Sequence, residues 1–430
     1  MQLLSFIVLL IYKLITFLIA PLGMAFLCYK KRRDPPYGKR KWELLGFVPY
    51  KFKRSIWFHT VSVGEVIAAR PLIELFVKRH PKLNVIVTTT TTTGALEAQK
   101  IKGITHIFAP LDSPLALRLF TSKVKPSHLF IMETELWPNM LDICYKHHVN
   151  ICIFNARMPE RTCQKYLKIK GLIYHLIAKK IHTVIAQSQE DAMRFIRIGV
   201  CKDNVFVANS LKYDLIPNEE IFKDTYAYRR QVTPNDFVIG AISTHDGEEE
   251  QILEVFYSLA DSYANLKLVL VPRHKSGVKK AVDFLNEVEG LYTLRSSVTN
   301  LNTLWQHNVI IGDTIGEIEL YLGLCNIVFM GGSLIDIGGH NPLEPAYFAL
   351  PILTGPYYYN FKTQYDDLID KRAAYLANDA KRLYVLLDKF INDKELCVKT
   401  GLRALDVQEQ GRGAIKKTLE LFEVNLKKTI

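Results

Sequence analysis

The segment with the most evident capacity for chemistry is GGSLIDIGGHNPLEPAYFALPILTGP, residues 331–356. It follows the apolar run 327–330, which reads as a strand that ends in paired glycines. Gly338 and Gly339 let the backbone approach a ligand closely, because neither carries a Cβ. A glycine-rich turn that leads into a helix presents free N–H groups and the positive end of the helix dipole. The segment therefore predicts a site for a phosphate group.

The residues after these glycines suit the start of that helix. Asn341 can cap it, Pro342 fits its first position, and Glu344 occupies the acidic position of a capping box. Glu344 is then either a cap or a partner for sugar hydroxyl groups. Because Pro345 blurs where the helix begins, the spacing leaves both roles open.

In the first half of the chain, the motif HTVSVGE ends in Glu65. A strand is expected to end near Phe58, Ser62 and Gly64 to form a turn, and a helix to begin directly after Glu65. The dipole of that helix would keep the carboxylate ionised and able to accept a proton. Acids are also common in first helical turns for structural reasons, and position alone favours that plainer role.

The motif METELWPN, residues 132–139, supplies two more carboxylates. Glu133 and Glu135 flank one threonine after an expected strand, so both would point the same way if the strand continued. The carboxyl ends of parallel strands are where ligands bind. The alternative is a solvated loop in which Trp137 is a packing residue.

Further polar turns follow other apolar runs. Arg157 and Arg161 lie in the motif NARMPER, and guanidinium groups suit carboxylate or phosphate, although a surface charge cluster has the same composition. In the second half, such turns follow three expected strands, at 243–245, 272–274 and 312–317. Several polar turns at the strand ends of one half predict a ligand site there.

Short apolar runs alternate with stretches of helical periodicity along most of the chain. This alternation predicts an α/β fold of two Rossmann-like halves, with parallel sheets covered on both faces and ligand groups around a central cleft. The expected strands are 55–58, 84–87, 128–132, 151–154 and 183–186, then 237–239, 268–271, 309–311 and 327–330. The clearest expected helices are 66–79, 113–121 and 189–198.

Composition limits the classes of partner. The chain has 430 residues, a net charge of +12 and a sequence pI of about 9.1, which favours an anionic partner. Because no zinc-finger spacing, arginine-rich run or RNA-binding signature is present, a membrane surface or an anionic small molecule is favoured over nucleic acid. The seven cysteines form no CxxC pair, which indicates buried thiols in a reducing compartment and no metal site.

The N-terminus is the clearest targeting feature. Residues 3–28 are apolar except for Lys13 and are followed by the basic run 30–33. Basic residues after the apolar run, rather than before it, argue against a cleaved signal peptide and keep the following domains in the cytoplasm. Lys13 and Pro21 leave open whether the helix spans the membrane or lies in its interface. The alternative is a buried helix of the domain itself.

These observations predict a domain organisation. Residues 1–29 would form the membrane-anchor helix and 30–211 the first Rossmann-like domain. Residues 212–235, rich in charge and turn formers, would be a linker to the second Rossmann-like domain, 236–410. Residues 411–430 have a helical pattern and would pack back on either half.

The ordered set of motifs resembles one known family. HTVSVGE, METELWPN, NARMPER, STHDGEEE, VPRH, GDTIGE and GGSLIDIGGHNPLEPA occur in this order and resemble the 3-deoxy-D-manno-octulosonic acid (Kdo) transferases of Gram-negative bacteria. The resemblance runs from the N-terminal helix almost to the C-terminus. It implies a GT-B glycosyltransferase of the inner membrane, with its domains on the cytoplasmic side. Such an enzyme takes Kdo from CMP-Kdo and adds it to the lipid A precursor lipid IVA, with inversion and without metal or cofactor.

The same resemblance implies roles for single residues. Glu65 is the general base, and Glu135 and Lys212 steady the transition state. CMP is held by two residues after a strand, by a turn and by the NPLE segment: Pro272, Arg273, Ile315, Gly316, Glu317, Asn341, Pro342, Leu343 and Glu344. Two positions depart from the family pattern, Pro159 where a serine is expected and Asp246 where a glutamate is commoner. Neither removes a catalytic group, and Pro159 would reshape the acceptor loop.

Two other classes compete with this interpretation. One is a GT-B-like nucleotide-sugar epimerase or another nucleotide-sugar glycosyltransferase, which would use a UDP-sugar and, as an epimerase, no lipid acceptor. The other is a non-catalytic protein that binds anionic lipid through its basic surface. The second class leaves the ordered motifs unexplained.

Overall fold

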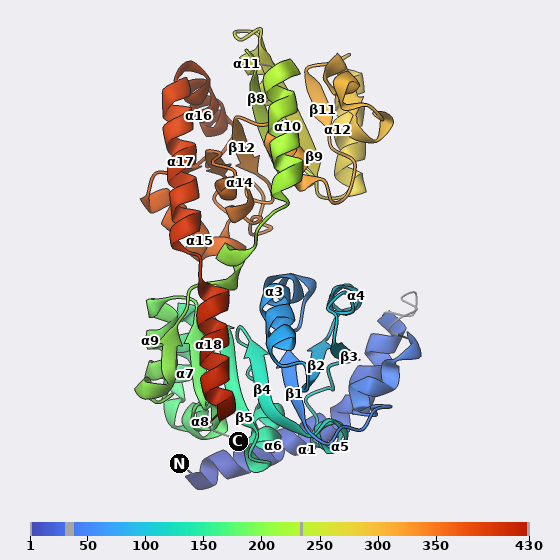
Figure 1. Cartoon of the computed structure of the whole chain (residues 1–430), viewed down its shortest axis with the longest axis vertical. Coiled ribbons are helices and arrows are strands. Elements are labelled where there is room, and N and C mark those ends of the chain that lie inside the picture. The colour runs from blue at the N-terminus through green and yellow to red at the C-terminus, as the bar shows by residue number, and fades with distance from the viewer. Residues whose placement is uncertain (1, 31–37, 233–234, 428–430) are drawn as a thin grey trace. The chain divides into compact units, whose positions relative to one another are not determined.

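The computed structural model describes residues 2–30, 38–232 and 235–427. The chain forms two compact units, unit 1 from residues 1–215 with 411–430, and unit 2 from residues 216–410. Each unit is built on its own seven-stranded sheet, and every strand pairing is parallel (Figure 1). The α/β class with two Rossmann-like sheets, expected from the alternation of runs, is confirmed.

The sheet of unit 1 has the strand order β3-β2-β1-β4-β5-β6-β7. The order reverses between β1 and β4, which makes the carboxyl ends of these two strands the topological switch point, the usual ligand position of such sheets. The strands β3 and β7 were not expected from the sequence, because polar residues interrupt the apolar run of β3 and β7 is short. The strand bounds are β1 Ser55–His59, β2 Asn84–Thr89, β3 Ile104–Phe108, β4 Pro126–Met132, β5 Asn150–Ala156, β6 Thr183–Ala186 and β7 Val205–Val207.

Both faces of this sheet are buried. Alternate residues of each central strand point to opposite faces, so Trp57 and Leu129 join one apolar cluster while Phe58 and Phe130 join another. The helices that cover the faces are α3 Val63–Arg79, α4 Thr92–Ala98, α5 Pro114–Val124, α6 Pro138–Lys146, α7 Glu160–Lys168, α8 Lys170–Leu176, α9 Gln189–Arg197 and α18 Ala414–Lys427. Short 3₁₀ turns are η1 Lys41–Leu45, η2 Ala178–Lys180, η3 Lys202–Asn204 and η4 Leu211–Asp214.

The closing helix α18 packs on unit 1. The ring of Phe422 stacks on that of Phe130 with centroids 3.9 Å apart. The carboxylate of Asp214 accepts hydrogen bonds from the backbone N–H groups of Gly413 and Ile415, both 2.6 Å, and so caps the start of α18. The chain therefore returns to unit 1 after completing unit 2.

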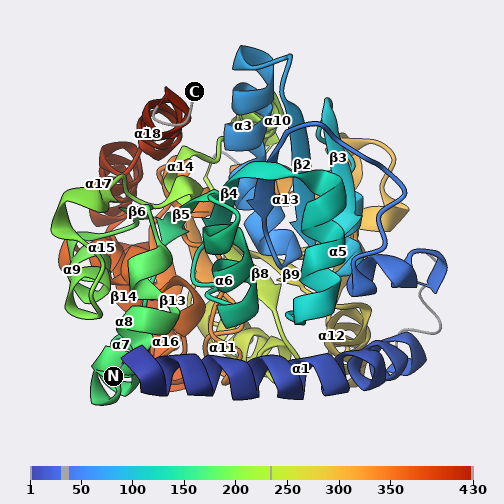
Figure 2. The same ribbon diagram turned by 90° about the horizontal axis from the view of Figure 1, so that it is seen from below.

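The N-terminal helix α1, Gln2–Lys30, lies lengthwise along unit 1, where it packs against η1, α5 and α8 (Figure 2). Its inner face makes polar contacts: Tyr12 donates to Asp112 at 2.8 Å, Lys13 pairs with Asp142, and Thr16 accepts from Asn139 at 2.9 Å. Its other residues include many exposed apolar side chains, among them Leu3, Phe6, Leu10, Leu14, Phe17, Leu18 and Leu22. By length and composition α1 can also cross a membrane. Of the basic run 30–33, residues 31–33 lie outside the described residues.

The sheet of unit 2 has the order β10-β11-β9-β8-β12-β13-β14, with its switch point between β8 and β12. The strand bounds are β8 Phe237–Thr244, β9 Leu266–Pro272, β10 Tyr292–Leu294, β11 Val309–Ile311, β12 Ile327–Met330, β13 Ile352–Thr354 and β14 Ala374–Leu376. The helices are α10 Glu219–Val232, α11 Glu249–Ala260, α12 Lys275–Glu287, α13 Ile318–Leu324, α14 Leu343–Tyr347, α15 Lys362–Asp370, α16 Ala380–Asn392 and α17 Lys394–Gln410, with 3₁₀ turns η5 Arg295–Ser297, η6 Leu301–Gln306 and η7 Tyr359–Phe361.

Helix α10 occupies most of the segment 212–235 that the sequence suggested as a linker. Many of its residues are charged, yet one face of the helix packs against the rest of unit 2. Phe222 stacks on Phe348 with centroids 3.9 Å apart, and Thr225 is buried against α13, where Gly323 leaves room for it. Composition alone does not reveal such a helix, because only a few of its residues are buried.

Candidate active site

Glu65 lies at the start of α3, next to the switch point of unit 1. Ser62 is the N-cap, and its Oγ accepts from the Glu65 N–H at 3.4 Å. In return the Glu65 carboxylate accepts from the Val61 N–H at 2.9 Å and from the Ser62 hydroxyl at 3.1 Å. Glu65 therefore has the structural capping role that its position suggested.

The electrostatic surroundings of Glu65 differ from the expectation. Burial raises the pKa of Glu65 to about 7, and the nearby charges of Glu133 and Glu135 act in the same direction. The prediction that the helix dipole keeps this carboxylate readily ionised is therefore wrong, because loss of solvent outweighs the dipole. A carboxyl group that titrates near neutral pH is suited to take up a proton during a reaction and release it afterwards.

Glu133 and Glu135 follow the neighbouring strand β4, and their charges act on Glu65, although not for the reason expected. Strand β4 ends at Met132, and Glu133 has a left-handed backbone with φ of 58°. The strand does not continue, so the alternation argument fails. Glu135 is instead held by Trp137, whose Nε1 donates to its carboxylate at 2.7 Å. The switch point thus collects three carboxylates from the ends of β1 and β4.

Lys212 adds a positive charge beside these carboxylates. Burial lowers the pKa of Lys212, the charges of Glu133 and Glu65 raise it, and that of Arg157 lowers it again. Its place is fixed by the buried Asn155, whose Oδ1 accepts from the Leu211 N–H at 3.0 Å. Glu65, Glu135 and Lys212, to which the family resemblance assigns joint catalytic roles, therefore lie in one electrostatic cluster.

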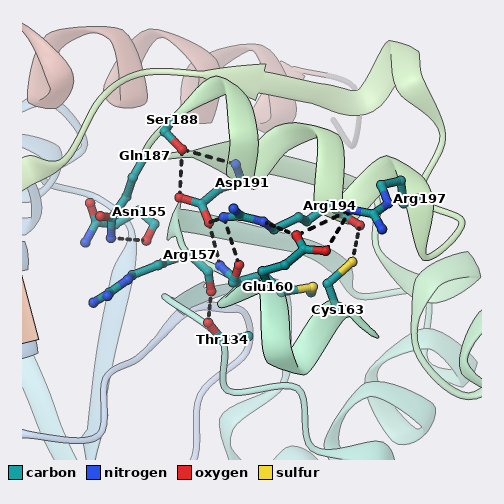
Figure 3. Close-up of polar contacts among 11 residues, drawn as sticks. Thr134, Asn155, Arg157, Glu160, Cys163, Gln187, Ser188, Asp191, Arg194 and Arg197 are labelled. Carbon is teal, nitrogen blue, oxygen red and sulfur yellow. Dashed lines mark hydrogen bonds and ion pairs between the residues drawn. The ribbon is translucent and has the colours of Figure 1, made fainter. Parts of the chain in front are cut away.

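The loop that carries Arg157 is held by residues that the sequence motifs did not reveal. Asp191 accepts from the Met158 N–H at 2.8 Å, and Arg194 pairs with Glu160 at 2.9 Å (Figure 3). In Figure 3 the Arg157 side chain points away from these ion pairs. Asp191 and Arg194 lie on α9, far along the chain, so no local motif could have identified them. Arg161 is exposed.

Unit 2 contains a pocket of about 180 Å³ at the carboxyl ends of β8, β9 and β11. Among its lining residues are Pro272, Arg273 and the turn 315–317, to all of which the family resemblance assigns the nucleotide. Ile315 is 96% exposed and thus open to a flat ligand group. Helix α12 begins at Lys275, beside Arg273, so two cationic side chains and a helix N-terminus meet in this pocket. This combination suits a phosphate.

The NPLE segment is arranged differently from the sequence prediction. Helix α14 has only five residues, and Pro342 is its N-cap rather than its first residue. Asn341 Oδ1 accepts from the Leu343 N–H, and Asn341 Nδ2 donates to Glu344, both at 3.2 Å. Burial raises the pKa of Glu344, and the charge of Arg273 opposes this, which indicates that Arg273 lies near the segment. Glu344 is thus tied to Asn341 and does not act as a cap for the backbone.

Three amides of the glycine-rich turn are occupied, so they are not the free N–H groups that the sequence predicted for a phosphate. The buried carboxylate of Glu248 accepts from the N–H groups of Gly332 at 2.6 Å, Ser333 at 3.0 Å and Leu334 at 2.8 Å. It also accepts from the His245 N–H at 2.9 Å. Glu248 is therefore an internal anion that fills this nest of amides. The sequence showed only an acidic run before a helix, with no sign of this role.

Gly338 and Gly339 also have a different role from the predicted one. Both have positive φ, of 103° and 75°. A Cβ at Gly338 would lie 2.5 Å from side-chain atoms of Tyr359 and Asn360, and one at Gly339 would lie 3.1 Å from the backbone of Tyr358. These glycines therefore make room for the segment 357–360 rather than for a ligand.

Comparison with known proteins identifies the family. Residues 39–215 match the family of 3-deoxy-D-manno-octulosonic-acid transferases (kdotransferase). Over 418 residues the chain is 32% identical to the 3-deoxy-D-manno-octulosonic acid transferase of Haemophilus influenzae, an alignment that covers 95% of this chain and 97% of that protein. The chain belongs to this family. It is a glycosyltransferase that transfers Kdo in lipopolysaccharide synthesis.

Further similarities agree with this Kdo transferase assignment and with the fold. The transferase of Bordetella pertussis is 29% identical over 363 residues, covering 79% of this chain and 82% of that protein. The UDP-GlcNAc 2-epimerase of Neisseria meningitidis has a TM-score of 0.57 at 13% identity, covering 85% of this chain and 98% of that one. That similarity shows the shared GT-B-like fold alone.

Proposed function

We propose that this Kdo transferase moves Kdo from CMP-Kdo to the lipid A precursor lipid IVA with inversion at the anomeric carbon, and that Glu65 is its general base. The observation that supports this most is the surroundings of Glu65. Burial and the charges of Glu133 and Glu135 raise its pKa to about 7 at the switch point of unit 1.

The reaction is a single displacement. An acceptor hydroxyl gives its proton to the Glu65 carboxylate as its oxygen forms a bond to the anomeric carbon of Kdo. The bond from that carbon to the phosphate of CMP breaks, and CMP leaves with the bonding electron pair. In the transition state, the negative charge of Glu135 steadies positive charge on the sugar ring, and Lys212 offsets the negative charge of the donor.

In the donor site, Arg273 and the N-terminus of α12 would bind the phosphate of CMP. The turn 315–317 and the segment 341–344 would hold the nucleoside. Because side-chain cations and a helix dipole would face the single phosphate, this assignment needs no divalent ion.

The direct test is to incubate the enzyme with CMP-Kdo and lipid IVA, with and without EDTA, and to read the products by mass spectrometry. We expect one CMP for each Kdo transferred, an inverted linkage, and the same rate in EDTA. A product with retained configuration would overturn the single displacement, and loss of activity in EDTA would overturn metal independence.

We expect Arg273→Ala to weaken CMP binding by about 10–100-fold, because a hydrogen bond to a charged group is worth about 1.5–3 kcal/mol. Isothermal titration with CMP measures this. Lys280→Ala is the matched control, since Lys280 lies on α12, the helix that follows Arg273, but pairs with Asp246 at 3.2 Å. Equal CMP affinity in the two variants would remove Arg273 from the donor site.

The pH profile of kcat/KM is expected to have its acid limb near pH 7. The base must be ionised, so activity falls about tenfold for each pH unit below the pKa of Glu65. Glu133→Gln removes a negative neighbour, lowers the pKa of Glu65 and moves the limb to lower pH. The remote variant Glu74→Gln is the control and should leave the acid limb in place. An acid limb that also stays in place in Glu133→Gln would contradict the assignment.

The enzyme is proposed to work at the cytoplasmic side of the inner membrane, with α1 lying in the membrane interface. The contacts of Tyr12 and Lys13 with Asp112 and Asp142 hold α1 along unit 1 and leave its apolar face exposed. We expect Leu14→Glu with Leu18→Glu to abolish flotation with anionic vesicles. Retained flotation would exclude this face as the membrane contact.

A further inference from the structure

A second cavity, of about 450 Å³, lies in unit 1, and the proposed reaction assigns no ligand to it. Its volume lies in the range of roughly 300–1,000 Å³ typical of small-molecule sites. It is about three times as large as a cavity of about 150 Å³ that holds a benzene molecule. Its wall is mainly apolar and includes Leu27, Leu44, Trp57, Leu117, Trp137 and Met140.

The cavity connects two parts of unit 1 that the proposed function already uses. Leu27 belongs to α1, the helix with the exposed apolar face. Val61 and Glu135 also line the cavity. The Val61 N–H holds the carboxylate of Glu65, and Glu135 contributes to its electrostatic surroundings. The cavity therefore extends from the inner side of α1, where Leu27 packs on unit 1, to the neighbourhood of the base.

One polar atom in the cavity wall is unsatisfied. His59 lines the cavity and is 4% exposed. Its Nδ1 is 2.9 Å from Thr88 Oγ1, whereas its Nε2 is buried without a hydrogen-bond partner among the described residues. Burial lowers the pKa of His59 to about 4, so the ring is neutral at physiological pH. A buried polar atom without a partner is costly, and a ligand hydroxyl, which can both donate and accept, would satisfy Nε2 in either tautomer of the ring.

The carboxylate of Asp112, which also lines the cavity, already accepts hydrogen bonds from the protein. Asp112 accepts from Tyr12 on α1 and from the N–H groups of Asn139 and Met140, at 2.8, 3.2 and 2.8 Å. Among the residues that the structure describes, no lysine or arginine lines the cavity. The site therefore does not suit a nucleotide, a phosphate or a free sugar, and does suit a long apolar chain that carries a hydroxyl group.

We propose that this cavity binds an acyl chain of the lipid acceptor, entering from the side of α1 and placing the acceptor hydroxyl beside Glu65. The proposal rests on the proposed function, because a lipid acceptor is what supplies such a chain. Burial of the chain would add apolar binding energy that a head group alone cannot provide.

Direct binding is measured with the tryptophans of the cavity. The chain has four tryptophans, and Trp42→Phe with Trp305→Phe leaves Trp57 and Trp137, both in the cavity wall. We expect dibromostearic acid below its micelle concentration to quench their fluorescence saturably. Ala109→Phe, which fills the cavity from a buried position in its wall, is expected to abolish the quenching. Absent quenching, or quenching that survives Ala109→Phe, would overturn the proposal.

A kinetic experiment tests this proposal independently of the proposed function. We expect Ala109→Phe to raise KM for acylated acceptor at least tenfold relative to KM for deacylated acceptor. Leu115→Phe, at an exposed position of α5 outside the cavity, should leave this ratio unchanged. Ala109→Leu is the milder filling variant if the phenylalanine prevents folding. An unchanged ratio with normal Kdo transfer would refute the acyl site alone, whereas absence of transfer from CMP-Kdo in the parent enzyme would refute the proposed function.

Discussion

Glu65→Gln is expected to lower kcat for Kdo transfer by about 10²–10⁴-fold, the usual contribution of a general base. Glutamine keeps the shape of the side chain and still accepts from the Val61 N–H, so α3 remains capped. What the variant loses is the ability to take the proton from the acceptor hydroxyl. Single-turnover transfer with CMP-Kdo measures the loss directly.

The control for Glu65→Gln is thermal stability, because a merely structural glutamate predicts the opposite pattern. The folded pKa of about 7 lies above the ordinary value of 4.5, so ionisation of Glu65 destabilises the fold as pH rises through this window. Below pH 4.5 the group is neutral in both states and makes no difference. We therefore expect the variant to have at pH 8 a Tm no lower than that of the parent enzyme. A lower Tm with near-normal transfer would show that Glu65 is only a cap.

Glu248→Ala is expected to lower the free energy of unfolding of unit 2 by about 3–5 kcal/mol. The change removes the carboxylate that accepts four backbone N–H groups, at His245, Gly332, Ser333 and Leu334. Each buried donor left without an acceptor costs about 1–3 kcal/mol, and partial relaxation reduces the sum. Hydrogen exchange of the amides at 332–334 reports the loss locally, and we expect these amides to exchange faster.

Glu250→Ala is the matched control for this prediction, because Glu250 is an exposed residue of the same acidic run. It should leave both the unfolding free energy and the exchange of the glycine-rich turn unchanged. If Glu248→Ala were no more destabilising than Glu250→Ala, Glu248 would not be the internal anion of this turn.

The elements of the fold were largely predictable, because buried parallel strands read as continuous apolar runs. The expected strands 183–186, 309–311 and 327–330 coincide with β6, β11 and β12. Where apolar residues are few or interrupted, the signal is lost. Strand β3 and helix α10 are the clearest cases. Their contacts with neighbouring elements, rather than their own residue patterns, distinguish them from loops.

The sequence by itself determined which residues of this protein stand at the strand ends, because the order of strands, turns and helices is local. The ordered motifs also identified the family, which the comparisons confirm. Tertiary structure alone decided the chemistry of these residues. Burial beside Glu133 and Glu135 sets the pKa of Glu65, and the glycine-rich turn binds Glu248 instead of presenting free amides. Both effects arise from desolvation and from contacts between segments distant in the chain, and neither is encoded in local spacing.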